Sequence, residues 1–248
     1  MNECFDGNIP VTQLLKGELE YFAPRYGWKP VFLNNVVVGR YFEDEFAGYC
    51  LLENIYPKDK NQSSFLQTYQ TFEQIKMALE TVGMDFLHVV RTWFYLDKLY
   101  DWYAEFNEIR TGFFKQYGVF DNHIPASTGI GAANLHGTYL ISNVLAVKPK
   151  NKDIRIGTVP SPLQCEATNY QSSFSRAVEI VFPAHRQLYI SGTASIDNDG
   201  NSAHLGDIAS QIDLTMNVVD QIIASRAMNW NNAVRSIAYF KDIRHVTA

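Results

Sequence analysis

Two segments of the sequence, 65–104 and 209–248, match each other without a gap at the offset that separates Arg91 from Arg235. The matched pairs are Gln67 and Gln211, Thr71 and Thr215, Ile75 and Val219, Leu79 and Ile223, Met84 and Met228, Val90 and Val234, Tyr95 and Tyr239, and Ala104 and Ala248. Chance similarity between two amphipathic helices is the alternative. The match also includes the turn and the segment after each helix, which favours one structural unit laid down twice.

The repeated piece has the pattern of a helix followed by a strand. Apolar residues recur at steps of three and four in both copies, as on one face of an α-helix, and Asp207 stands where a cap of the second helix is expected. The segments "HVVRTWFYL" and "AVRSIAYF" are rich in β-branched and aromatic residues, which predicts strands. The apolar positions are Phe65, Tyr69, Phe72, Ile75, Leu79 and Val82 in the first copy and Ile208, Ile212, Met216, Val219 and Ile223 in the second.

The first copy extends into a complete unit, which we expect over 28–148. A hairpin, "PVFLNN" and "VVVGRYF", precedes the repeated piece, and a second apolar helical stripe from Leu99 to Tyr117 follows it. Two strands, "STGIGAANL" and "TYLISNVLAV", complete the order β-β-α-β-α-β-β. This order predicts an α+β fold in which helices cover one face of a mixed sheet.

The second copy is shorter, and it sets the expected domain organisation. Residues 1–148 are expected to hold the first unit with an N-terminal extension, 149–173 a linker rich in Pro, Ser, Thr and Asn or an extended arm laid across the units, and 174–248 the second unit. That unit opens with "RAVEIVF" and "QLYISGTASI" but has no counterpart of the last helix and two strands. Two explanations are open: the chain is a fragment of a longer protein, or the second unit is a natural remnant that lacks these elements. The fragment is favoured because half a sheet exposes an unpaired edge.

Composition excludes several classes of function. The chain has 21 basic and 26 acidic residues, no basic run and no zinc-type spacing, so we expect no nucleic-acid partner. It has no run of 18 apolar residues, so we expect no membrane partner. Three widely spaced cysteines and no signal-peptide pattern favour a cytoplasmic location. The six histidines show no metal-ligand spacing, and we expect neither a metal nor an organic cofactor.

At this point the motifs resemble those of a known superfamily. "LYISGTASI" followed by "GDIASQIDLTMNVVDQIIASRAMNWNNAVRSIAYFKDI", together with the matching stretch of the first unit, resembles the RidA/YjgF superfamily. "SPLQCEATNYQSSFSRA", "SGTASI", "HLGD" and "PASTGIG" look like its tandem branch, the chorismatases. The resemblance implies chorismate-mutase-like units, a homotrimer with pockets between subunits, a small-molecule carboxylate substrate and no cofactor. The reaction it implies is hydrolytic loss of pyruvate from chorismate, giving a dihydroxycyclohexadiene carboxylate or a hydroxybenzoate.

The sequence departs from the family patterns in two places. RidA proteins carry an arginine after Pro-Ala, whereas the matching stretch here is Pro125-Ala126-Ser127-Thr128, and a neutral hydroxyl cannot replace a guanidinium. The resemblance also implies an arginine, a cysteine and an acidic proton donor in the C-terminal part of chorismatases, at positions that would lie beyond Ala248. Two alternatives therefore stay open: a non-catalytic ligand-binding module, and a RidA-like imine deaminase with a rearranged anion site.

Chorismate carries two carboxylates, so a pocket for it should offer at least two cations. Arg110 and Arg176 are the candidates, with Tyr103 two turns before Arg110 on the same helical face. Tyr170 is a further candidate that could donate its hydroxyl from the linker. The structural alternatives are a surface arginine over the sheet edge for Arg110, an edge-strand charge for Arg176 and an exposed tyrosine for Tyr170.

Two small-residue segments are the remaining candidates for substrate binding. "STGIG", with Thr128 and Gly129, resembles an anion-binding loop, or else a strand whose glycines admit a close neighbour. "SGTAS", with Ser191, Gly192 and Ala194, leaves room for a ligand, or else forms a β-bulge. No catalytic residue is assigned.

Overall fold

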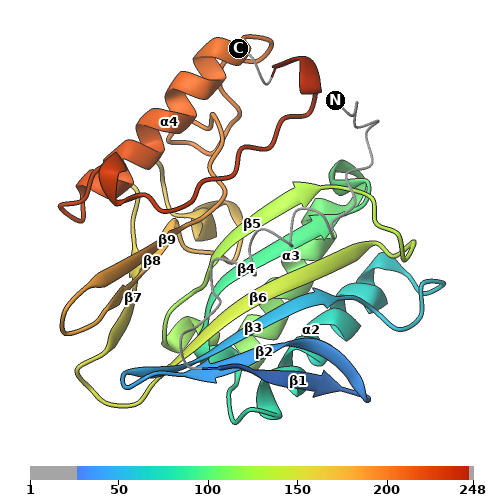
Figure 1. Cartoon of the computed structure of the whole chain (residues 1–248). Helices are drawn as coiled ribbons and strands as arrows, with labels where there is room; N and C mark the ends of the chain where they lie inside the picture. Colours follow the sequence, from blue (N-terminus) through green and yellow to red (C-terminus); the bar gives the residue numbers. More distant parts are fainter. Residues whose placement is uncertain (1–26, 246–248) are drawn as a thin grey trace, which may run out of the picture.

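A computed structural model describes residues 27–245, and its elements form four stacked layers (Figure 1). Two helices, α2 (Ser64–Glu80) and α3 (Leu99–Gln116), cover one face of a six-stranded sheet. A three-stranded sheet packs on the opposite face, and α4 (Ile208–Ala224) covers the outer side of this smaller sheet. The expected α+β class, with two tandem units and helices on one face of a mixed sheet, is confirmed. No helix among the described residues has the length and apolar character needed to cross a membrane.

The six-stranded sheet belongs to the first unit, and it has one strand more than the predicted order β-β-α-β-α-β-β, because the strand at 47–55 was not predicted. Its strands run in the order β1-β2-β3-β6-β4-β5, and β4 with β5 is its parallel pair. Both residues at the tip of the opening hairpin, Asn34 and Asn35, have positive φ, as tight hairpin turns require. The strands are β1 (Lys29–Leu33), β2 (Val36–Glu43), β3 (Ala47–Ile55), β4 (Val89–Leu96), β5 (Ala126–Gly131) and β6 (Leu140–Pro149).

Aromatic side chains between the helices and the sheet form the main core. Phe72 of α2 is fully buried, and its ring lies 5.1–6.4 Å from five other phenylalanine rings. The Ser63 hydroxyl caps α2 by accepting a hydrogen bond from the Leu66 amide. The rings around Phe72 come from α3, β4 and the short 3₁₀ helix η1 (Phe86–His88). This one side chain of α2 therefore packs against three other elements.

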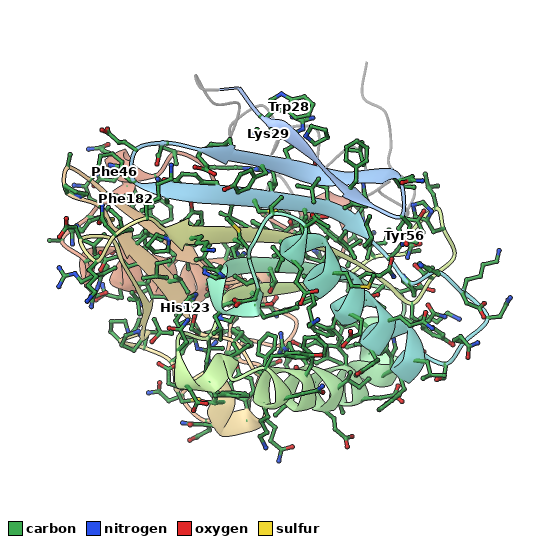
Figure 2. All side chains as sticks on the ribbon, turned by 90° about the horizontal axis from the view of Figure 1, so that it is seen from below. Trp28, Lys29, Phe46, Tyr56, His123 and Phe182 are labelled. Carbon is green, nitrogen blue, oxygen red and sulfur yellow. The ribbon has the colours of Figure 1, made fainter. Side chains whose placement is uncertain are left out.

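The second unit packs on the face of the large sheet that the helices leave uncovered. Its strands, in the antiparallel order β7-β8-β9, are β7 (Arg155–Val159), β8 (Ala177–Val181) and β9 (Arg186–Ile190). Figure 2 shows Phe46 and Phe182 side by side where the two sheets meet, with ring centroids 6.0 Å apart. The predicted linker 149–173 needs a correction, because β7 lies inside it and forms an edge of the second sheet. The remaining 3₁₀ helices are η2 (Val119–Asp121), η3 (Ala167–Tyr170), η4 (Trp230–Asn232) and η5 (Ile243–His245).

The repeat is confirmed for its helix and for the turn after it. The bounds of α2 and α4, and those of η1 and η4, correspond at the offset that pairs Arg91 with Arg235. The two turns even share a capping arrangement, from Asp85 in one and Asn229 in the other. Local sequence therefore produces the same local structure twice.

The strand predicted at "AVRSIAYF" is wrong. Residues 233–240 run as irregular chain near α4 (Figure 1), and Val234 is 72% exposed, whereas its counterpart Val90 is buried in β4. In the first unit β4 pairs with β5 and β6, both of which follow it in the chain. Within residues 27–245 no strand pairs with 233–240, and a segment with strand-forming residues becomes a strand only where a partner accepts its backbone hydrogen bonds.

Replacing Phe72 with alanine tests the core. We expect Phe72→Ala to lower the free energy of unfolding by about 3–5 kcal/mol, because it leaves a cavity among packed rings. Phe65→Ala removes the same side chain from a position of α2 that is 47% exposed, and should cost much less. Urea unfolding followed by circular dichroism measures both variants. Equal losses would contradict the assigned core.

Candidate anion-binding site

Three arginine side chains are buried: Arg91, Arg110 and Arg176 are 6%, 2% and 3% exposed. Arginine is rarely buried in a protein unless a carboxylate pairs with it. Within residues 27–245, neither Arg110 nor Arg176 forms an ion pair. Within these residues the two positive charges therefore lie in the interior without a carboxylate at ion-pair distance, and Glu166 is an acidic residue whose charge interacts with Arg176.

Arg110 lies on the face of α3 that points to β5. Its Nη1 donates to the Ser127 hydroxyl at 3.4 Å and its Nη2 to Asn107 Oδ1 at 2.5 Å, while its buried Nε has no hydrogen-bond partner. Asn107 in turn donates to the backbone carbonyl of Tyr103, one turn earlier. Burial lowers the pKa of Arg110, and the phenols of Tyr103 and Tyr170 oppose this effect. The surface position considered for Arg110 is thus wrong.

Arg176 reaches the same region from the chain just before β8. Its Nε and Nη2 both donate to the carbonyl of Cys165, at 2.9 and 2.6 Å. Its guanidinium lies 5.5 Å from the Tyr170 ring centroid and 5.6 Å from that of Phe174, distances typical of cation–π contacts. The guanidinium of Arg110 lies 5.6 Å from the same Phe174 ring. One aromatic ring thus contacts both buried cations.

Two tyrosines complete this group. Burial raises the pKa of Tyr170, and the charge of Arg176 and a hydrogen bond with it oppose the increase. Tyr103 and Tyr170 are half-buried, whereas Arg110, Phe174 and Arg176 are buried, so the tyrosines are the partly exposed members of the group. A Cβ at Gly129 would lie 3.5 Å from the Tyr103 ring, an ordinary van der Waals contact, so Gly129 lies beside Tyr103 but this approach does not require glycine. We call Tyr103, Arg110, Tyr170, Phe174 and Arg176 the arginine cluster.

Three other predicted residues lie where the two sheets join. Ser191 Oγ accepts from the Ser127 amide at 2.8 Å and donates to the Ser175 carbonyl at 2.5 Å. The amide of Gly192 donates to the Ser127 carbonyl at 3.0 Å, and a Cβ on Gly192 would meet Thr128 at 2.7 Å. The structure thus brings the chain at Gly192 close to Thr128, whereas the alternative considered for Ser191 and Gly192 was a β-bulge. A ligand contact for these residues stays a prediction.

Ala194 is an exposed residue in the loop after β9. Its carbonyl accepts a hydrogen bond of 3.2 Å from the side-chain amide of Gln164. The same amide also reaches the Ile196 carbonyl at 3.2 Å, so Gln164 fixes the course of this loop. Nothing in this geometry relates Ala194 to a bound anion, and its role stays a prediction.

Sequence reasoning missed three residues of this region. Asn107 stands four residues after Tyr103 and three before Arg110, a helical spacing that could have revealed it. Phe174 had no signal of its own, because only the packing of the second unit brings it between the arginines. Glu166 was missed for the same reason: burial raises its pKa, and nearby Arg176 opposes the increase.

The arrangement suits an anion better than a metal. It offers guanidinium and phenol donors, and carboxylates bind bidentate arginine well. Among the described residues, no group of three or more His, Cys, Asp and Glu side chains could share a metal ion. A ligand with two carboxylates would match the two buried charges.

Comparisons with known proteins agree with this fold. Residues 55–142 match the model of the endoribonuclease L-PSP family, also called RidA/YjgF. A solved chorismatase structure is 20% identical with a TM-score of 0.60, and the match covers 79% of this chain and 59% of that one. Yeast Mmf1 (20% identity, TM-score 0.39) and E. coli TdcF with bound serine (16%, 0.40) match 49% and 48% of this chain and 93% and 92% of theirs. No curated protein sequence matches.

The burial of Arg110 leads to a prediction about stability. A core arginine held for packing should destabilise the protein when it is removed, whereas a desolvated charge kept for a ligand should not. We expect Arg110→Met to leave the free energy of unfolding of the ligand-free protein unchanged or higher.

The matched control is Arg155→Met, at an exposed arginine of β7, which should change stability by less than about 0.5 kcal/mol. Urea denaturation measures both proteins. A loss above about 2 kcal/mol in Arg110→Met alone would show that Arg110 is a structural residue.

Proposed function

Because the first unit of this chain belongs to the RidA/YjgF superfamily and the chain shares the fold of a chorismatase, we propose that it binds chorismate at the arginine cluster. The proposed reaction is hydrolytic loss of pyruvate, which leaves a ring alcohol that keeps its own carboxylate. The chain spans 59% of the length of the solved chorismatase. The proposal therefore concerns the arginine cluster of this chain and not the activity of a whole chorismatase.

The observation that supports this proposal is the pair of buried guanidinium groups that form no ion pair within residues 27–245. Removing an arginine from water costs several kcal/mol unless an anion compensates for the lost hydration. Arg110 and Arg176 both lie against Phe174, and Arg110 has a buried donor without a hydrogen-bond acceptor. Chorismate would bring one carboxylate for each guanidinium, and its flat diene ring suits the aromatic surroundings.

Hydrolysis of chorismate requires that the site binds the anionic substrate and that one proton is delivered to it. Protonation of the methylene carbon of the enolpyruvyl group turns it into a methyl group and leaves an oxocarbenium ion at the neighbouring carbon, which bears the ether oxygen. Water adds to this ether-bearing carbon and loses a proton, which forms a hemiketal. The hemiketal then breaks the bond between this carbon and the ether oxygen; its hydroxyl loses a proton and the ether oxygen gains one, which releases pyruvate and the ring alcohol. The arginines would hold both carboxylates while Tyr103 and Tyr170 face the substrate at the open side of the cluster.

A second candidate function, hydrolysis of a 2-imino acid, draws support from one contact. The RidA pattern has an arginine where this chain has Ser127, but the guanidinium of Arg110 reaches the Ser127 hydroxyl from α3. A cation is therefore present beside this position, supplied by a different element. The guanidinium of Arg110 is buried and lies near Arg176, an arrangement that fits a ligand with two carboxylates better than a ligand with one. Chorismate is therefore the preferred substrate.

The direct test is to incubate the protein with chorismate and to measure pyruvate with lactate dehydrogenase and NADH. We expect Arg110→Gln and Arg176→Gln each to lower kcat/KM by about 10- to 100-fold, since each removes charge-assisted hydrogen bonds to the substrate. Isothermal titration calorimetry should show a similar loss in affinity. Arg155→Gln, at an exposed arginine, serves as the control and should behave as wild type.

The outcomes separate the candidate functions. Binding of chorismate without pyruvate release would favour the non-catalytic ligand-binding module. Ammonia release from imine-generating substrates, with chorismate neither bound nor hydrolysed, would favour the deaminase. Equal activity in wild type and in both arginine variants would exclude the arginine cluster as the site.

A further inference from the structure

Glu166 is an acidic residue placed at the edge of the arginine cluster. It is half-buried, and it directly follows Cys165, whose carbonyl accepts both hydrogen bonds from Arg176. It stands at the cap position of η3, yet its side chain makes no capping hydrogen bond. Within residues 27–245 its carboxyl also forms no ion pair. The chain thus places Glu166 one residue from the carbonyl that binds Arg176, and the two charges interact without forming an ion pair.

The groups that face this carboxyl determine its charge. Arg176 is the nearby cation and opposes the effect of burial on the pKa of Glu166. Tyr170, on η3, lies against Arg176, and Tyr103 and Arg110 belong to the same cluster from α3. Cys165 adjoins Glu166 in the chain. The positive charge of Arg176 is therefore what favours the ionised form of Glu166 in the ligand-free protein.

A bound anion would reverse this balance. A carboxylate on Arg176 neutralises the charge that favours ionised Glu166, and it brings a second negative charge close to it. Two carboxylates that share a half-buried site disfavour double ionisation, so one of them takes up a proton. The neutral acid can then donate its O–H to the bound carboxylate.

We propose that Glu166 takes up a proton from solvent when a carboxylate ligand binds to the arginine cluster, and donates a hydrogen bond to that ligand. The inference rests on the proposed function for the identity of the ligand, but not on turnover. No bond other than that to the proton is made or broken. Glu166 would be the residue that makes anion binding depend on pH.

The direction of this dependence follows from linkage. The ligand prefers the protonated form, so the pKa of Glu166 is higher in the complex than in the free protein. Affinity is greatest below the free-protein pKa, falls as pH rises between the two pKa values, and is constant above the higher one. Within that interval the Kd should increase by up to about tenfold per pH unit.

The experiment is isothermal titration calorimetry with chorismate between pH 5 and pH 8, in buffers of different ionisation enthalpy. Wild type should take up as much as one proton per bound ligand. Glu166→Gln, which keeps the size of the side chain and cannot titrate, should show no uptake and a nearly constant Kd. Glu108→Gln makes the same change at an exposed position of α3 and should match wild type.

The results distinguish a failure of this inference from a failure of the proposed function. If wild type and Glu166→Gln bind chorismate with the same proton uptake, Glu166 is not the linked group and the proposed function still stands. If wild type does not bind chorismate, the proposed function is wrong, and the titration is repeated with pyruvate. Absence of binding by pyruvate as well, or binding without proton uptake, would overturn the inference too.

Discussion

The hydrogen bonds between the first residues of β5 and the second unit hold this structure together. The Ser175 amide donates to the Pro125 carbonyl, and Ser191 and Gly192 both bond to the backbone of Ser127. These bonds fix the start of β8 beside the end of α3. Arg176 and Phe174 therefore meet Arg110 only because the second unit is bonded to the edge of the first.

This junction also explains why the guanidinium of Arg110 is buried. Within residues 27–245 the second unit covers Arg110 and forms no ion pair with it, so the guanidinium loses hydration and gains hydroxyl, amide and aromatic partners. Such an arrangement costs free energy in the ligand-free protein. Proteins tolerate that kind of cost at functional sites. Under the proposed function, a ligand that accepts a hydrogen bond from the unsatisfied Nε of Arg110 would offset this free-energy cost.

The repeat shows how far sequence reasoning could go. The helix and the capped turn of both copies were predictable, because apolar spacing and caps act within a few residues. The same residue types predicted a strand at 233–240, where none forms, since a strand depends on a partner elsewhere in the chain. β7 was mistaken for a linker because its short and weakly apolar segment is recognisable only once it pairs with β8.

The sequence by itself determined the helices, five of the six strands of the first unit and the placement of Tyr103 and Arg110 on one helical face, but it did not reveal β3, which lies between β2 and β6. The helices and the helical face follow from the periodicity of side chains along a regular backbone. Only the tertiary structure decided which candidates meet. It joined Arg176, Tyr170 and Phe174 to Arg110, and it placed Thr128, Ser191 and Gly192 at the junction instead. The reason is that contacts between distant segments depend on how two sheets stack, and no local pattern in the chain encodes that geometry.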